Sequence, residues 1–250
     1  MRTLDKLKPG IQKIEQEEIR LPGIRKVTLI GDAGCTGFDE ASRKILGQLL
    51  KHESDLYFIL GDLAFTGAEE EFQEVIDFFN SRVQAPVFAL RGNHDIANYE
   101  KFLGLSTYAV VLDRFVCLFL NNGTGCFPDE DLAFLSKELD KHPDRNFLLF
   151  MHVPPPTDIH RSHMPQAEWG KLKAVLDQHR ERISHIFCAH IHGYHHYELD
   201  GYPVTITAGG GAAMIHDLKS PEQKFHHAVV VHLGDNGHLT TELVIVRDGA

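Results

Sequence analysis

The chain has 250 residues, of which 43% are hydrophobic, and its formal net charge is −10 at pH 7. This length can bury one sizeable core or a sandwich of two sheets, while the acidic balance argues against a long nucleic acid as a partner. No apolar stretch reaches the ~18 residues of a membrane-spanning helix. The charged N-terminus lacks a signal-peptide pattern and the four cysteines indicate no disulfide framework, so a cytoplasmic location is expected.

Strands and helices alternate in the first half of the chain. Hydrophobic runs predict strands, and amphipathic spacing predicts helices, in the order strand 27–30, helix 39–52, strand 56–60, helix 69–83 and strand 87–90. Connections of this kind are right-handed and produce a parallel sheet. The carboxyl ends of its strands then meet at one edge, where α/β sheets place their sites.

The second half is expected to turn antiparallel. A two-residue turn at 113–114 joins predicted strands over 108–112 and 115–120. The remaining predicted elements are a helix over 129–141, a strand over 147–151, a helix over 169–180, strands over 183–188 and 203–207, and a hairpin around 234–237. There are no repeats and no low-complexity linker, so we expect one domain over 1–250, with residues 1–23 as an N-terminal extension.

Five short motifs place metal-ligand side chains at the ends of predicted strands. The motifs are GDAG at 31–34, GD at 61–62, GNHD at 92–95, MH at 151–152 and HIH at 190–192. Any single motif fits an ordinary turn, but the ordered set predicts a shared site. Carboxylate, carboxamide and imidazole groups suit two divalent metal ions such as Mn, Fe or Zn. The side chains supplied are Asp32, Asp62, Asn93, His94, His152, His190 and His192.

This ordered set resembles the calcineurin-like metallophosphoesterases, whose pattern runs D-x-H, G-D, G-N-H-D/E, a lone His and G-H-x-H. The resemblance covers the chain from about Lys26 onward. It implies an α/β fold in the form of a four-layer α/β/β/α sandwich with two mixed β-sheets. It also implies a hydrolase that acts on phosphoric ester bonds through a hydroxide bridging two metal ions, with a small phosphomonoester or phosphodiester, a cyclic nucleotide included, as its substrate.

The resemblance also implies which residues bind each of the two metal ions. In the family one carboxylate bridges the two metals, and the matching residue here is Asp62. Asp32 and His192 would complete the first metal site by the same resemblance. The second site would be completed by Asn93, His152 and His190.

His94 sits beside a ligand but corresponds to a residue that does not bind metal in the family. It is therefore our candidate for the general acid that protonates the leaving alkoxide. Asp95 would act behind it, by orienting His94 or the loop that carries it.

The first motif departs from the family pattern. Gly34 stands where most members have a metal-binding His, so we expect the first metal to bind more weakly than the second, with room at this corner for a substrate group or Cys35. A thiolate is a good ligand for Fe or Zn, yet a cysteine in such a loop is also commonly a small packed hydrophobe. Purple acid phosphatases share D-x-G but use a Tyr where this chain has Phe65, so iron–tyrosinate chemistry is not expected. Ala189 in place of the usual Gly is a mild change.

The loop after His152 carries His160, Arg161 and His163, which are candidates for contacts with a small phosphorylated substrate. An alternative from another class is a non-catalytic binding module on the same fold, with Gly34 as the sign of a lost ligand. The retained His94 favours the enzyme, since a scaffold needs no general acid. The sequence leaves open the natural substrate, the preference for monoester or diester, the native metal and the oligomeric state.

Overall fold

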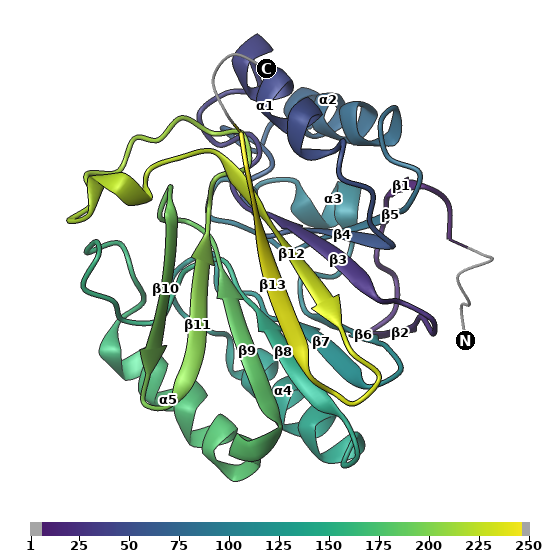
Figure 1. Ribbon diagram of the computed structural model, residues 1–250, viewed down its shortest axis with the longest axis vertical. Coiled ribbons are helices and arrows are strands. Elements are labelled where there is room, and N and C mark those ends of the chain that lie inside the picture. The colour runs from purple at the N-terminus through teal and green to yellow at the C-terminus, as the bar shows by residue number, and fades with distance from the viewer. Residues whose placement is uncertain (1–6, 247–250) are drawn as a thin grey trace.

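Two β-sheets face each other, and helices cover the outer face of each (Figure 1). The computed structural model describes residues 7–246. The predicted four-layer α/β/β/α sandwich with two mixed sheets is therefore confirmed. None of the helices within this described part is long and apolar enough to cross a bilayer.

The first sheet has six strands, and its central strands come from the first half of the chain. Its order is β1 (Gly10–Ile11), β5 (Pro86–Ala89), β4 (Leu56–Ile59), β3 (Lys26–Ile30), β12 (His227–Leu233) and β13 (Leu239–Ile245). The strands from β1 to β3 pair in parallel, as predicted for 27–30, 56–60 and 87–90. The closing hairpin β12–β13 adds antiparallel strands beside β3.

The second sheet has seven strands. Its order is β10 (Tyr194–Leu199), β11 (Tyr202–Thr207), β9 (Ile183–Cys188), β8 (Asn146–Phe150), β7 (Phe115–Phe119), β6 (Tyr108–Val111) and β2 (Glu18–Arg20). The antiparallel prediction holds for the pairs β6–β7 and β10–β11. It is wrong for the centre, where β7, β8, β9 and β11 are parallel. Helices cross over from β7 to β8 and from β8 to β9, and such crossovers return the chain in the same direction.

The helices form the two outer layers. The described chain has α1 (Glu40–Leu49), α2 (Glu69–Asn80), α3 (Tyr99–Leu103), α4 (Asp129–Lys141) and α5 (Gln166–Leu176), followed by the 3₁₀ segments η2 (Asp177–Arg182) and η3 (Pro221–Gln223). The helix predicted over 39–52 begins one residue later, because Asp39 is its cap and accepts a hydrogen bond from the Ser42 backbone N–H at 2.9 Å.

The N-terminal segment belongs to both sheets. Residues 1–23 were expected to be an extension, yet β1 pairs with β5 at the edge of one sheet and β2 pairs with β6 at the edge of the other. Residues 1–6 of that extension lie outside the described part of the chain. The described part of the segment therefore covers a sheet edge on each side of the core.

The main core lies between the sheets. Phe58 of β4, Phe119 of β7 and Phe150 of β8 are fully buried, and their ring centroids lie 4.9–5.2 Å apart. Burying each such side chain contributes about 1.5–3 kcal/mol. Two further clusters pack α1 and α2 on the first sheet and α4 and α5 on the second. With both faces of each sheet covered, the reactive groups are left at the rim where the parallel strands end.

Candidate metal centre

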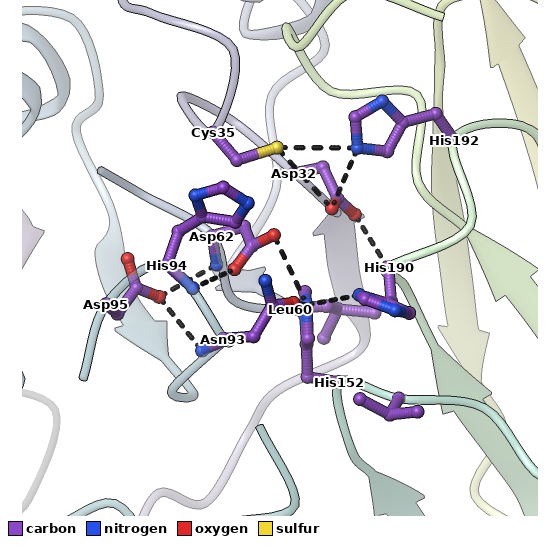
Figure 2. Close-up of polar contacts among 12 residues, drawn as sticks. Asp32, Cys35, Leu60, Asp62, Asn93, His94, Asp95, His152, His190 and His192 are labelled. Atoms are coloured by element: carbon purple, nitrogen blue, oxygen red, sulfur yellow. Dashed lines mark hydrogen bonds and ion pairs between the residues drawn. The ribbon is translucent and has the colours of Figure 1, made fainter. Parts of the chain in front are cut away.

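The predicted ligands meet at the carboxyl ends of β3, β4, β5, β8 and β9, where the two sheets face each other (Figure 2). Asp32, Asp62 and His190 have left-handed backbones with φ of 55°, 55° and 67°, and they make up three of the four non-glycine residues in this region among residues 7–246. A left-handed backbone costs a non-glycine residue roughly 1 kcal/mol. Such strain gathers at functional sites, where the surrounding fold enforces it.

The second cluster, defined as Asp62, Asn93, His152 and His190, centres on one imidazole nitrogen. His152 Nε2 lies 3.3 Å from Asp62 Oδ2, 3.0 Å from Asn93 Oδ1 and 3.3 Å from His190 Nδ1. Donor atoms of Asp62, His152 and His190 all lie within 4.8 Å of one another. The structure thus brings together the four residues that the sequence assigned to the bridging position and to the second metal.

A hydrogen bond on the side away from the cluster fixes the orientation of the His152 ring. Its Nδ1–H donates to the Leu60 carbonyl at 2.8 Å, which leaves Nε2 as the atom that faces the cluster. Asn122 Oδ1 accepts the His152 backbone N–H at 2.8 Å, and Asn122 Nδ2 donates to the Val153 carbonyl at 2.7 Å. Sequence reasoning missed Asn122, which lies two residues beyond the predicted strand 115–120.

The first cluster, defined as Asp32, Cys35 and His192, lies beside the second. His192 Nε2 is 3.4 Å from Asp32 Oδ1 and 3.4 Å from Cys35 Sγ. His192 Nδ1–H donates to the Ala213 carbonyl, so Nε2 is again the atom turned toward the cluster. His216, which sequence reasoning did not single out, accepts the His192 backbone N–H at Nδ1 over 3.1 Å.

The backbone at Gly34 leaves no room for a side chain. Gly34 N–H donates to the Asp62 carbonyl at 2.9 Å, and a Cβ on Gly34 would lie 2.0 Å from the Leu63 carbonyl oxygen. The expectation that this glycine leaves space for a substrate group is therefore wrong, because the loop after β4 fills it. The third member of this corner is Cys35, which is only 3% exposed.

Asp95 organises the two central loops rather than the ring of His94. Its carboxylate accepts backbone N–H groups of Asp62, Leu63, Ala64 and Gly92 at 2.8–3.0 Å. Burial and the neighbouring Asp62 raise its pKa to about 6 despite these hydrogen bonds. Asp95 thereby fixes the turn that presents Asp62. One of these four N–H groups, that of Gly92, belongs to the loop that carries His94, and the other three belong to the loop after β4.

His94 lies at the edge of both clusters. Its backbone N–H donates to Asp62 Oδ1 at 3.0 Å, and its Nδ1–H donates to the Phe65 carbonyl at 2.6 Å. Nε2 is consequently the ring atom available to a substrate. A His94 ring nitrogen lies within 4.8 Å of Asp62 and Cys35 donor atoms. The ring also stacks on Phe65, whose side chain is half exposed at the rim.

The two histidines of the second cluster titrate in opposite directions. Burial alone would lower the pKa of His152, but the charge and hydrogen bond of Asp62 outweigh it and raise the pKa to about 10. For His190, burial and the positive charge of His152 lower the pKa to about 3. The raised pKa favours the protonated form of His152 beside the buried Asp62 carboxylate when no metal is bound.

The loop that follows His152 lines a cavity of about 480 Å³, to which His160, Arg161 and His163 contribute. The His160 ring lies 4.7 Å from the His216 ring, which lies 4.7 Å from the His192 ring. These ring contacts place the cavity beside the first cluster. A larger cavity of about 670 Å³ includes Arg91 and Asp131, and its lining contains none of the predicted ligands.

Comparisons with known proteins agree with this geometry. Among curated proteins, the chain is 28% identical over 165 residues to a probable glycerophosphodiester phosphodiesterase GpdQ from Arcobacter nitrofigilis, over 57% of this chain and 58% of that protein. The chain thus spans a little over half the length of this relative.

Among solved structures, the purple acid phosphatase PPD1 from yellow lupin matches with a TM-score of 0.72 at 14% identity, over 91% of this chain and 52% of that one. A dimetal phosphatase from Danio rerio matches with a TM-score of 0.66 at 12% identity, over 89% of this chain and 96% of that one. At these identities the two structures show the shared fold. The family described as Calcineurin-like phosphoesterase matches residues 25–194, which contain every predicted ligand, and the chain belongs to that family.

Proposed function

We propose that this protein is a metal-dependent phosphoesterase that hydrolyses a small phosphodiester at a centre of two divalent metal ions. The observation that carries the proposal is the position of Asp62. Its carboxylate lies 3.3 Å from His152 in the second cluster and within 4.8 Å of Cys35 in the first. One carboxylate is therefore within reach of both clusters.

The donor atoms fit divalent cations of the first transition row. Both clusters combine carboxylate oxygens with imidazole nitrogens, a set that suits Mn, Fe and Zn. Asp32 and Asp62 are buried, and among the described residues their ion pairs involve histidines alone. Buried carboxylates need compensating positive charge. The hydrogen bonds from Nδ1 of His152 and His192 to backbone carbonyls leave Nε2 of each ring facing its cluster.

When bound, two such cations supply a water of lowered pKa and positive charge for the phosphate oxygens. The chain's own residues hold the centre in place and handle the leaving group. His94 is the proposed general acid, because its Nδ1–H is engaged by the Phe65 carbonyl and its Nε2 is free. As an imidazolium, His94 would give the Nε2 proton to the departing alkoxide and keep the Nδ1 bond.

The preference for a diester rests on the curated relative, whose name describes a glycerophosphodiester phosphodiesterase. The second alcohol of a diester needs a place to lie. The cavity beside the first cluster offers one, and it presents Arg161 and Lys219 together with Asp158 and Asp217. A polar alcohol such as glycerol matches this mixed lining better than an apolar group does.

The test is hydrolysis by purified protein loaded with Mn and, separately, with Zn. Substrates are bis(4-nitrophenyl) phosphate, 4-nitrophenyl phosphate and a glycerophosphodiester, and metal content is measured on the same samples. We expect turnover that is lost on chelation, returns with metal and is faster for the diesters. Two bound metal ions without turnover of any ester would favour the non-catalytic binding module. Faster hydrolysis of the monoester would overturn the diester preference alone.

A further inference from the structure

Cys35 differs in its surroundings from the other buried cysteines. Cys117 and Cys188 lie inside β7 and β9 within apolar clusters, as small packed hydrophobes do. Cys35 Sγ instead lies 3.4 Å from His192 Nε2 and 3.8 Å from Asp32 Oδ1. Figure 2 shows this sulfur directed at the same space as the His192 ring and the Asp32 carboxylate.

The same sulfur also lies near Asp62, the proposed bridging ligand. Donor atoms of Cys35, Asp62 and His94 lie within 4.8 Å of one another, as do those of Asp32, Cys35 and His192. One thiol therefore belongs to two groups of potential ligands, which share no other member. A packing role does not require a cysteine to face two carboxylates and two imidazoles.

The first cluster lacks the ligand that the family pattern places at position 34. The family pattern places an imidazole at position 34, but the Leu63 carbonyl blocks any side chain there. Without another donor, Asp32, Asp62 and His192 would be the only protein ligands of the first cation. Structural zinc sites use four ligands, and Mn and Fe commonly use more. The residue that follows the glycine brings a sulfur to the cluster.

We propose that Cys35 Sγ is a ligand of the first metal ion and takes the place of the imidazole that position 34 cannot carry. This inference rests on the proposed two-metal centre. As the sulfur–metal bond forms, the thiol gives its proton to solvent and binds as the thiolate. The first site is then a mixed sulfur, nitrogen and oxygen site, whereas the second has nitrogen and oxygen alone.

A thiolate changes which metal the first site prefers. Soft sulfur ligands favour Zn and Fe over Mn, while carboxylate and carboxamide oxygens suit Mn. The first site should therefore prefer Zn or Fe over Mn more strongly than the second site does. With Cys35 as a ligand, the first site would bind Zn or Fe selectively, instead of being the weak site expected from the sequence.

The decisive measurement is X-ray absorption at the zinc edge of the 250-residue protein loaded with two equivalents of Zn. We expect a sulfur shell at about 2.3 Å besides the nitrogen and oxygen shell near 2.0–2.2 Å. Cys35→Ser should lose the sulfur shell, and the exposed Cys126→Ser should keep it. Loading with Co²⁺ gives a second readout, since a thiolate ligand adds a near-ultraviolet charge-transfer band that Cys35→Ser should lack.

Metal titration distinguishes an error in the Cys35 assignment from an error in the proposed two-metal centre. Cys35→Ser should weaken Zn binding at the first site at least tenfold, since loss of even an outer-shell partner costs about 10–100-fold, and leave binding at the second site near wild type. Two zinc ions bound by the wild-type protein without a sulfur shell would overturn the Cys35 ligand alone. A wild-type protein that takes up no metal would overturn the proposed function and this ligand with it. The wild-type spectrum decides the question even if the variant fails to fold.

Discussion

The Oδ2 atom of Asp62 lies 3.3 Å from the Nε2 atom of His152, and this buried pair joins the end of β4 in one sheet to the end of β8 in the other. The centre is thus built across the interface between the sheets. Each sheet supplies part of the second cluster, so its geometry depends on how the two sheets pack. Asp62 also lies next to the first cluster, so we expect both clusters to depend on it.

Replacing Asp62 should therefore cost more metal than replacing any single histidine. We expect Asp62→Ala to lose both equivalents of metal and hydrolysis with them, while His152→Ala empties mainly the second site. Elemental analysis of protein equilibrated with limiting Mn measures this directly. Wild-type activity and metal content in Asp62→Ala would show that the two-metal interpretation is wrong.

The role of His94 can be separated from metal binding. Because its Nδ1–H is held by Phe65 and its ring lies outside the ligand set proposed here, His94→Ala should keep its metal and lose turnover by about 10²–10⁴-fold. The defect should shrink for esters of nitrophenol, which leave without protonation. A plot of rate against the pKa of the leaving alcohol checks this. An equal defect with every leaving group would remove the general-acid assignment.

Binding of a cation in the second cluster should release a proton. Since Asp62 raises the pKa of His152 to about 10, His152 is protonated at pH 7 in the metal-free protein and must lose that proton before Nε2 can bind a cation. Affinity should therefore rise as pH increases from 6 to 9, by about tenfold per unit for one proton. Calorimetry in buffers of different ionisation enthalpy counts the protons. His185→Gln is the control, because burial already lowers the pKa of His185 to about 3.

A second, partly buried network should control acid stability. Partial burial would raise the pKa of Glu18, but the hydrogen bond and charge of Lys141, together with His142 and Arg20, outweigh it and lower the pKa to about 2. A lowered carboxyl pKa stabilises the fold above pH 4.5, and this contribution is lost as pH falls toward 2. The ion pair between Glu18 and Lys141 also joins β2 to α4. The same Lys141 ammonium group pairs with Glu138, so it supplies the positive charge for both carboxylates.

The matched pair of variants is Glu18→Gln and Glu17→Gln. Glu18→Gln should lower the melting temperature at pH 7 and flatten its fall between pH 5 and 2. Glu17→Gln breaks an exposed pair with Lys137 and should change either quantity little. Thermal unfolding followed by circular dichroism across this pH range checks both. Identical pH profiles for the two variants would contradict the role of the Glu18 network.

Gly34 should tolerate no side chain. Its Cβ would fall 2.0 Å from the Leu63 carbonyl, so Gly34→Ala must displace the loop that presents Asp62 and should reduce both stability and metal content. Gly34→His should likewise fail to restore a ligand. The control is Gly47→Ala in α1, where nothing lies within 4 Å, which should stabilise the protein by about 0.5–1 kcal/mol. A Gly34→His protein with tighter metal binding would refute this account.

Much of the centre could be predicted from sequence because its geometry is local. Asp32 and Asp62 directly follow hydrophobic strands of one parallel sheet, so the end of each strand determines where the next side chain lies. The order of the motifs then identified the rim. The direction of β7, β8 and β9 was mispredicted, because a single hairpin signal was extended to strands that helices connect.

Other features depend on contacts between distant segments. Asn122 and His216 support His152 and His192 through backbone hydrogen bonds, and neither spacing nor composition marks such partners. The space around Gly34 is occupied by a carbonyl about thirty residues away in sequence, and only the packed structure reveals that. Residues 10–20 were assigned to the N-terminal extension, yet they pair with the sheet edges as β1 and β2.

The place of β12 beside β3 has a consequence for how the protein is made. A nascent chain presents β3, β4, β5, β8 and β9, and with them every predicted ligand, once residue 192 has emerged from the ribosome. The first sheet still lacks the neighbour of β3 until residues 227–233 emerge. The chain thus holds its complete ligand set before it can close the sheet that carries half of it. A metal ion bound at this stage would meet ligands whose backbone the completed sheet does not yet hold.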